Sequence, residues 1–376
     1  MGISAIFEAE NWNVPFHFWS AVFFVLGTLV GSFLNVCIYR MPQGLSIVRP
    51  PSHCPSCGYS IPWYLNMPLI TWAWLRGRCA NCGAPISFRY FAVELLTGGL
   101  FLLSWVVMGR ESPGMALVYC LVLSGFLTAT FIDFEHFIIP DEITIGGMVA
   151  GFLCSFAVPA IQGQEQAVLA LRDSAIGMAV GGGVLYGVLR GGKLLFGRRQ
   201  VELPPDSRVI FTETSLVLPE EEIPYEELFY RDSDMIQLEA KRLELSDRCC
   251  WSVPVRLRPK RLMIGEEEMD PETVHYMEVL TDRIVLPREA MGFGDVKFMA
   301  AIGAFFGWTS VLFTLLVSSI LGGTVGMLLI LMRQRAWTSR IPFGPYIVAA
   351  AVIWMFGGEA LMEWWLSGRW VSGVDG

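Results

Sequence analysis

The stretch "MGFGDVKFMAAIGAFFGW" (residues 291–308) places one acid and one base at the start of an otherwise apolar, glycine-rich run. A carboxylate at the edge of a membrane segment is costly unless it caps a helix, pairs with a cation or takes part in chemistry. Asp295 follows Gly292 and Gly294, two residues that let another backbone approach closely. The rest of the chain decides which of these roles Asp295 has.

The composition of the 376-residue chain is typical of a membrane protein. Apolar residues make up 53% of it, charged residues make up 16%, and its mean hydropathy is +0.50. Runs of about 18 or more apolar residues can span a bilayer as helices. Such runs lie near 17–39, 91–109, 115–132, 143–160, 174–197, 309–332 and 345–366. Together with the shorter stretch 296–307, expected to form a hairpin with 309–332, they predict an all-α polytopic membrane protein of about eight transmembrane helices.

The basic residues predict which side of the membrane each loop faces. All but three of the 27 Lys and Arg residues lie in the loops 40–90, 190–297 and 333–340. Short loops count most in the positive-inside rule, and the first and third of these loops agree with it. We therefore expect all three loops in the cytoplasm and both termini outside. No Lys or Arg precedes Arg40, so the first apolar run lacks the basic segment of a signal peptide and is expected to remain as a helix.

Residues 198–290 differ in composition from the membrane part. They carry 21 acidic and 13 basic residues, and the resulting balance of −8 equals the net charge of the whole chain. Short β-branched segments bounded by proline or acidic turns, such as "RVIFTETSLVL" and "SVPVRLRP", predict a small β-rich soluble insert. We interpret it as an acidic spacer domain. A docking surface for a basic partner is the alternative.

Two matched Cys-x2-Cys pairs, each followed by glycine, lie in the predicted cytoplasmic loop 40–90. Tetrahedral zinc takes four thiolates, and each such turn places two sulfur atoms on one ion. Disulfides are the alternative interpretation, but thiols in the cytoplasm are kept reduced. We therefore predict a structural zinc site in a ribbon-like loop, with the ligands Cys54, Cys57, Cys79 and Cys82.

A second acid at a membrane edge occurs in "FIDFEHFIIPDEIT" (131–144). Pro140 disfavours helical geometry at the residue before it, so we expect a break there and a new helix from Asp141. By the predicted orientation, Asp133 lies at the cytoplasmic end of its helix, where the macrodipole disfavours negative charge. Asp295 lies where the chain re-enters the membrane at the same face. The two carboxylates are therefore predicted to converge.

Asp295 and Asp141 each have a simpler explanation, because either acid could cap the helix that it opens. No such explanation fits Asp133. Two close carboxylates do not both ionise easily. The ionised one can take a proton from water, while the protonated one polarises a peptide carbonyl. The pair therefore predicts aspartic-protease chemistry at a membrane surface, with Asp133 and Asp295 as the catalytic residues.

Residues beside the predicted pair are expected to support the substrate or the loops. Gly292 and Gly294 are assigned to close approach of a bound chain. His136 and Asp141 are assigned to the loop after Asp133, and a metal role for His136 is the weaker alternative. Lys297 either lowers the pKa of a neighbouring aspartate or extends to the membrane interface.

Two polar residues in the apolar helices are also expected to have partners. Asn35 is expected to form a hydrogen bond between helices. Glu94 should pair with Arg89 or face the site.

Taken in order, the motifs resemble those of the type IV prepilin peptidases, members of the wider GxGD membrane aspartyl proteases. Besides the two Cys pairs, they are "GSFLNVCIYRMP" (31–42), "LRGRCANCGAPISFRYFAVELLTG" (75–98), "DFEHFIIPD" (133–141), "GFGDVKFMAAIGAFFGW" (292–308) and "IPFGPY" (341–346). A lone Gly-x-Gly-Asp would be weak evidence, but the ordered set is specific. The chain departs from the family pattern at 198–290, where typical members pass almost directly to the Gly-x-Gly-Asp motif.

The resemblance implies that Asp133 and Asp295 match the catalytic acids of the family. It implies cleavage, at the cytoplasmic face, of leader peptides of type IV prepilins or type II secretion pseudopilins. Such leaders end in Gly, usually before Phe, and precede an apolar helix. Many members also methylate the new N-terminus with S-adenosylmethionine, an activity associated with the Cys-bearing loop.

We therefore expect a multi-pass protein of the bacterial inner membrane, with these protein substrates and membrane lipid as partners and no nucleic acid. The partner of the insert is left open. Two functions of other classes are alternatives: a proton- or ion-coupled transporter, since buried acids also relay protons, and a non-catalytic membrane scaffold. The expected domains are the first helix (1–39), the cysteine loop (40–90), helices two to five (91–197), the insert (198–290) and the Gly-x-Gly-Asp part (291–376).

Overall fold

Two structural units account for the chain in the computed structural model. One is helical and consists of Met1–Leu185 with Phe293–Gly376; the other is Tyr186–Gly292. The residues that the structure describes are 16–110, 112–196, 198–219, 222–229, 234–274, 276–287, 292–332 and 342–366. The basic loop 333–340 and Arg369, both used in the orientation prediction, lie outside these residues. Each unit is described by itself.

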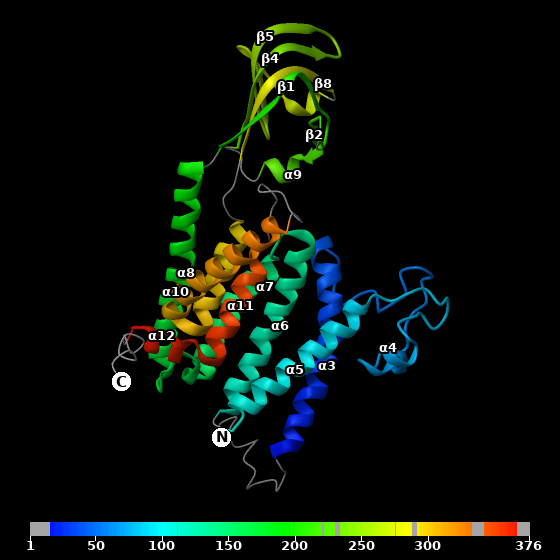
Figure 1. Cartoon of the computed structure of the whole chain (residues 1–376). Coiled ribbons are helices and arrows are strands. Elements are labelled where there is room, and N and C mark those ends of the chain that lie inside the picture. Colours follow the sequence, from blue (N-terminus) through cyan, green and yellow to red (C-terminus); the bar gives the residue numbers. More distant parts are fainter. Residues whose placement is uncertain are drawn as a thin grey trace. The chain divides into compact units, whose positions relative to one another are not determined.

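The helical unit is built mainly from long apolar helices (Figure 1). The longer helices are α3 (Phe16–Arg40), α5 (Phe88–Met108), α6 (Pro113–His136), α7 (Asp141–Ala157), α8 (Ala167–Phe196), α10 (Phe293–Leu331), α11 (Gly344–Ile353) and α12 (Glu359–Leu366). Single turns and a five-residue helix connect them: η1 (Met41–Gln43), η2 (Trp63–Leu65), α4 (Ile70–Trp74), η3 (Pro159–Gln162) and η5 (Trp354–Gly358). α8 continues past the boundary between the two units.

Local sequence signals explain where several helices begin and end. Ser112 precedes α6, and its hydroxyl accepts a hydrogen bond from the backbone N–H of Met115 at 3.3 Å, while Pro113 fills the first helical position. Phe137 ends α6 in the left-handed conformation. Pro140 then precedes α7, which begins at Asp141 as the sequence predicts.

Six helices in the described part of the chain are long and apolar enough to cross a membrane. They are α3 with η1, α5, α6, α8 up to Gly192, α10, and the stretch from α11 through Trp365. A mostly helical membrane protein is therefore confirmed, whereas the count of eight spans stays a prediction. The difference lies in α7, which has only 17 residues, and in α10, which is counted once although its backbone turns.

The turn in α10 lies at Gly307, whose backbone (φ 75°, ψ 179°) is not helical. A Cβ on Gly303 would lie 3.0 Å from Cγ2 of Val311. Residues eight apart in a continuous helix are about 12 Å apart along the axis, so the chain doubles back at this point. A positive φ is available to glycine at little cost. The break falls between the two segments that the sequence predicts to form a hairpin.

Glycines let the backbones of α8 and α10 approach very closely. A Cβ on Gly177 would overlap the carbonyl oxygen of Gly303, and one on Gly181 would lie 2.5 Å from the carbonyl oxygen of Met299. Small residues at such contacts are the usual basis of helix association in membranes. This contact holds the first half of α10, which carries Asp295, against α8.

Unit 2 contains one antiparallel sheet of eight strands in the order β3-β2-β1-β8-β4-β5-β6-β7. The strands are β1 (Arg198–Phe211), β2 (Ser215–Val217), β3 (Glu222–Pro224), β4 (Ile236–Leu245), β5 (Cys249–Arg258), β6 (Arg261–Ile264), β7 (Glu267–Met269) and β8 (Met277–Pro287). Two short helices accompany them, α9 (Tyr225–Leu228) and η4 (Pro271–Thr273). Seventeen buried apolar residues form its core. The predicted β-rich insert is confirmed.

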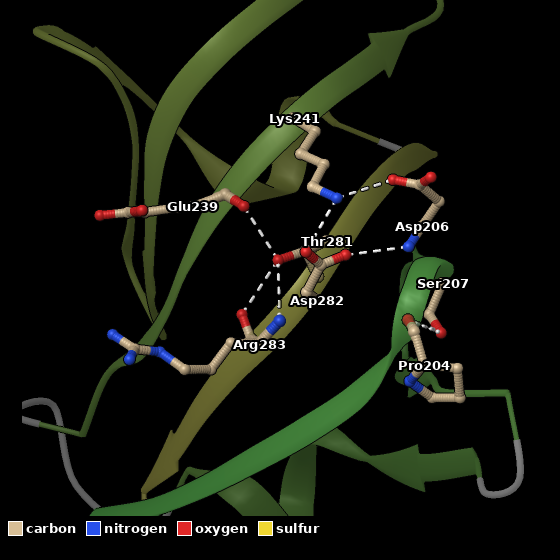
Figure 2. A network of polar contacts seen from close by, with 8 residues as sticks. All are labelled: Pro204, Asp206, Ser207, Glu239, Lys241, Thr281, Asp282 and Arg283. Carbon is tan, nitrogen blue, oxygen red and sulfur yellow. Dashed lines mark hydrogen bonds and ion pairs between the residues drawn. The ribbon is translucent and has the colours of Figure 1, made fainter.

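A polar network fixes an irregularity in this sheet, where the pairing of β1 with β8 shifts register between Glu202 and Ser207 (Figure 2). The Lys241 Nζ lies 2.8 Å from Oδ1 of Asp206 and 2.8 Å from Oδ2 of Asp282. The Lys241 ammonium lowers the pKa of Asp282, and the backbone N–H of Asp206 acts in the same direction. The buried Thr281 hydroxyl donates at 2.9 Å to the carbonyl oxygen of Glu239 in the neighbouring strand β4. These contacts tie three strands together at the bulge.

We predict that Gly177→Ala destabilises the helical unit by about 1–3 kcal/mol or more, because the added methyl group would meet the backbone of α10 rather than a side chain that can move. Thermal unfolding of the purified protein in detergent would measure the loss. Gly183→Ala in the same helix is the control, since a Cβ there meets nothing within 4 Å and alanine favours helix over glycine. Equal melting temperatures for the two variants would contradict the packing described here.

Candidate active site

Asp133 lies in the last turn of α6 and is only 5% exposed. Its Oδ2 accepts a hydrogen bond from the backbone N–H of Gly344, the first residue of α11, at 2.8 Å. A Cβ on Gly344 would lie 2.7 Å from that same oxygen. Glycine at position 344 is therefore required for this contact. The sequence shows Gly344 only as part of the "IPFGPY" motif, so this partner of Asp133 was not predicted.

Asp295 is the third residue of α10 and is 8% exposed. Gly294, the residue before it, lies beside Ile139, in the segment between α6 and α7: a Cβ on Gly294 would be 3.5 Å from the Ile139 Cβ. Gly292 is exposed and precedes the helix. By the observed bounds, Asp295 lies inside the first turn rather than at the N-cap. A carboxylate there still interacts favourably with the helix dipole.

Both acids lie at the same end of the helical unit, where α6 ends and α10 and α11 begin (Figure 1). The rings of Phe126 on α6 and Phe298 on α10 meet edge to face, with centroids 5.6 Å apart. Asp133 follows Phe126 by seven residues and Asp295 precedes Phe298 by three, so each acid lies near the side of its helix that carries the contacting ring. α11, which bonds to Asp133, also packs against α10.

Asp141, which follows Asp133, and Lys297, which follows Asp295, form an ion pair with each other. The Nζ of Lys297 lies 2.6 Å from Oδ1 of Asp141 and 5.2 Å from the centre of the Phe293 ring. This pair joins the first turns of α7 and α10. The interpretation of Asp141 as an N-cap is wrong: Pro140 occupies that position, and the Asp141 side chain binds Lys297 instead. The pair is partly exposed, so its contribution to stability is modest.

His136, which the sequence assigns to the loop after Asp133, is the last residue of α6, and it and the neighbouring Glu135 are both exposed. Glu135 forms an ion pair with Arg89 at the start of α5. Within the described residues, the one group of potential metal ligands does not include His136.

Glu94 does not pair with Arg89. It is buried in α5, and its Oε2 accepts a hydrogen bond from the backbone N–H of Leu69 at 2.8 Å. Leu69 has a φ of +60°, a conformation that leucine rarely adopts. A buried acid thus anchors the cysteine loop to the membrane helices. The predicted interhelical bond of Asn35 is confirmed, because its Nδ2 donates to the carbonyl oxygen of Tyr90 at 3.1 Å.

The four predicted cysteine ligands come together, with their sulfur atoms all within 4.8 Å of one another. The two Cys-x2-Cys turns repeat the same backbone pattern. Gly58 and Gly83, both at φ +71°, donate to the carbonyl oxygens of Cys54 and Cys79 at 2.8 and 3.0 Å. Glycine suits this left-handed position. Four closely spaced cysteines in this arrangement could bind a metal ion.

Backbone N–H groups in these turns point at the sulfur atoms. The N–H groups of Cys82 and Asn81 lower the pKa of Cys79 to about 6, and that of Tyr59, with the Asn81 side chain, lowers the pKa of Cys57. At Cys82 the N–H of Ala84 acts in the same direction but is outweighed by the neighbouring thiols, and the pKa rises to about 11. Donors of this kind stabilise thiolates, which are the form that binds metals.

We predict one tightly bound metal ion per purified chain. Cys57→Ser and Cys82→Ser should each release it, because a hydroxyl replaces one of four thiolate ligands. Elemental analysis by mass spectrometry would measure the metal content. Cys249→Ser, an exposed position in β5, is the matched control and should keep the ion. Wild-type protein prepared without chelators that carries no stoichiometric metal would contradict this prediction.

Comparisons with known proteins give matches along both parts of the helical unit. The family model described as "Bacterial Peptidase A24 N-terminal domain" matches residues 25–108. The family model described as "Type IV leader peptidase family" matches residues 120–199 and 274–327. Residues 200–273, most of the β-rich insert, lie outside both matches.

Several curated proteins are similar to this chain. A prepilin leader peptidase/N-methyltransferase of Myxococcus xanthus is 48% identical over 163 residues, which are 43% of this chain and 45% of the relative. One of Aeromonas hydrophila is 28% identical over 384 residues, covering 94% of this chain and 96% of the relative. One of Dichelobacter nodosus is 34% identical over 207 residues, covering 47% and 68%. No solved structure matches the chain. Taken with the two buried acids and the cysteine cluster, these matches show that the chain belongs to the type IV leader peptidase family.

Proposed function

We propose that this protein is a membrane aspartyl endopeptidase that removes the leader peptide of type IV prepilins or type II secretion pseudopilins. The observation that carries the proposal is the pair of buried carboxylates, Asp133 and Asp295, at one end of a bundle of membrane helices. Relatives that cover nearly the whole chain are named prepilin leader peptidase/N-methyltransferase, which agrees with this activity. The same names support N-methylation of the new N-terminus as a second activity.

In the proposed reaction the two carboxyl groups share one proton, because two neighbouring buried carboxylates cannot both be charged at low cost. The ionised group removes a proton from a water molecule, which attacks the peptide carbonyl carbon, and the protonated group donates to the carbonyl oxygen. The Gly344 N–H holds one oxygen of Asp133 in place. A fixed carboxylate needs no reorganisation when the water attacks.

We further propose that the acids face the cytoplasm of a bacterial inner membrane, in contact with lipid along the apolar helices. The cysteine loop joins the C-terminal end of α3 to the start of α5, at the same end as Asp133. It carries five arginines, Arg40, Arg49, Arg76, Arg78 and Arg89. Positive charge in a loop of this length favours the cytoplasmic side.

We propose that the cysteine cluster holds zinc. A tetrahedral Zn–S site with bonds of about 2.3 Å places its sulfur atoms about 3.8 Å apart, and Cys54 Sγ lies 3.9 Å from Cys82 Sγ. The ion would hold the two turns together as a structural centre. S-adenosylmethionine is proposed as the methyl donor on the relatives' names and the presence of this loop, without assignment of residues to it.

A peptidase needs both acids for cleavage of prepilin, whereas a transporter needs them for ion flux. We predict that Asp133→Asn and Asp295→Asn each lower the rate of prepilin cleavage at least about a hundredfold, because either change removes one member of the acid–base pair. The assay follows a purified prepilin by gel shift and mass spectrometry, with and without S-adenosylmethionine. Methyl addition to the mature N-terminus is read in the same spectra.

The matched control is Asp173→Asn, an acid near the start of α8 that interacts with Gln164 and Arg172. It should cleave normally. Normal cleavage by either active-site variant would exclude the proposed mechanism. Ion flux that depends on Asp133 and Asp295, in protein that does not cleave prepilin, would favour the transporter instead.

The insert is proposed to be a spacer that the chemistry does not need. Its two ends leave the sheet side by side, since Arg198 in β1 pairs with Pro287 in β8. Replacing residues 200–286 with a short linker should therefore join α8 to α10 without pulling them apart, and basal cleavage should be retained. Cleavage of the same prepilin by the shortened protein measures this. Loss of cleavage in a stably inserted variant would show that the insert acts on the substrate.

A further inference from the structure

A groove of about 360 Å³ on the helical unit is bounded by α3, α6, α7 and α10. Its lining is apolar except for Ser124, Thr128 and Glu142. The hydroxyls of Ser124 and Thr128 already donate to carbonyl oxygens within α6, at 2.8 and 2.9 Å. The groove therefore offers almost no hydrogen bonds to an occupant, and it suits an apolar one.

The length of the groove corresponds to about two turns of a helix. Its lining on α7 runs from Glu142 to Ala150, and that on α10 from Phe298 to Phe305, so each wall is about 10–12 Å long, or about two helical turns. Gly125, Gly146 and Gly147 contribute no side chains to it. Gly146 is exposed, and a Cβ there would meet nothing within 4 Å. Small residues of this kind allow another helix to approach closely in a membrane.

One end of the groove points toward the two acids. Thr128 lies five residues before Asp133 on α6, and Phe298 lies three residues after Asp295 on α10. Along the helix axes these separations are about 7.5 Å and about 4.5 Å. Phe126 and Phe298, whose rings contact each other, both line the groove near this end. A helix lying in the groove would thus end about one turn short of both carboxylates.

We propose that this groove holds the apolar helical segment of the substrate that directly follows the scissile bond. The inference rests on the proposed function, since it takes the two acids as the place of cleavage. Within a helix the peptide groups are hydrogen-bonded to one another, so the bond to be cut must lie beyond the end of the seated helix. The groove fixes where that end is, and so selects which peptide bond reaches the acids.

Glu142 adds charge selection at the same end. It is exposed at the start of α7, and among the described residues it has no hydrogen bond or ion pair. Its carboxylate favours a substrate with a positive charge next to the apolar segment. Hydrolysis adds one water across the peptide bond and leaves a carboxylate on the leader and an amine on the segment. The amine takes up a proton at neutral pH, so Glu142 can also hold the product.

The test uses two probes, a purified type IV prepilin and a peptide that contains its leader and the first few mature residues but lacks the apolar helix. Gly146→Leu should raise KM for the prepilin about tenfold or more with kcat little changed, because leucine fills the groove without touching the acids. Cleavage of the short peptide should stay as in the wild type. Gly99→Leu is the matched control: it is an exposed helix glycine on α5 with nothing within 4 Å of its Cβ position.

The outcomes separate this proposal from the proposed function. An unchanged KM of Gly146→Leu for prepilin, with Asp133→Asn and Asp295→Asn inactive, would overturn the groove assignment and leave the peptidase intact. Cleavage by the two aspartate variants would overturn the function itself. A photoreactive residue in place of Gly146, in the Asp133→Asn background, should cross-link to the apolar segment of prepilin. Adducts with membrane lipid alone would show that acyl chains fill the groove, and would also overturn the proposal.

Discussion

The central constraint on this molecule is the cost of burying two carboxyl groups at the ends of long apolar helices. Neither Asp133 nor Asp295 is exposed enough to be solvated as an ordinary surface acid, so the surrounding helices must supply what water would. α6 ends just after Asp133, α10 begins just before Asp295, and α11 gives Asp133 a backbone N–H. The helix termini are therefore arranged around the acids. The close contact of α8 with α10 and the Lys297–Asp141 pair hold that arrangement together.

Local patterns in the sequence predict much of this fold. The apolar runs indicate the membrane helices, Pro140 predicts the break before α7, and matched Cys-x2-Cys pairs predict the cysteine cluster. What sequence reasoning missed depends on long-range packing. Gly344 lies 211 positions from the acid that it bonds to, and no period or spacing indicates such a contact. The Glu94–Leu69 and Asp141–Lys297 contacts were missed for the same reason. The helix count also depends on packing, because a turn within apolar sequence leaves hydropathy unchanged.

The insert shows how a membrane enzyme can carry an additional unit. It has its own core of buried apolar residues and its own polar network at a sheet irregularity, and its ends are neighbours in the sheet. This unit lies between α8 and α10 in the sequence and has a core of its own. The family models match on both sides of it and not across residues 200–273. The groove beside the acids belongs instead to the part of the chain that the family shares.

The dependence of the prepilin cleavage rate on pH tests the central claim most directly. Two carboxyl groups that share one proton predict a bell-shaped profile of kcat/KM, because activity is lost both when the second proton binds and when the last one leaves. Circular dichroism at each pH would show that the protein stays folded. A profile without an acidic limb, or one that keeps its shape when either aspartate is replaced by asparagine, would contradict the shared-proton pair.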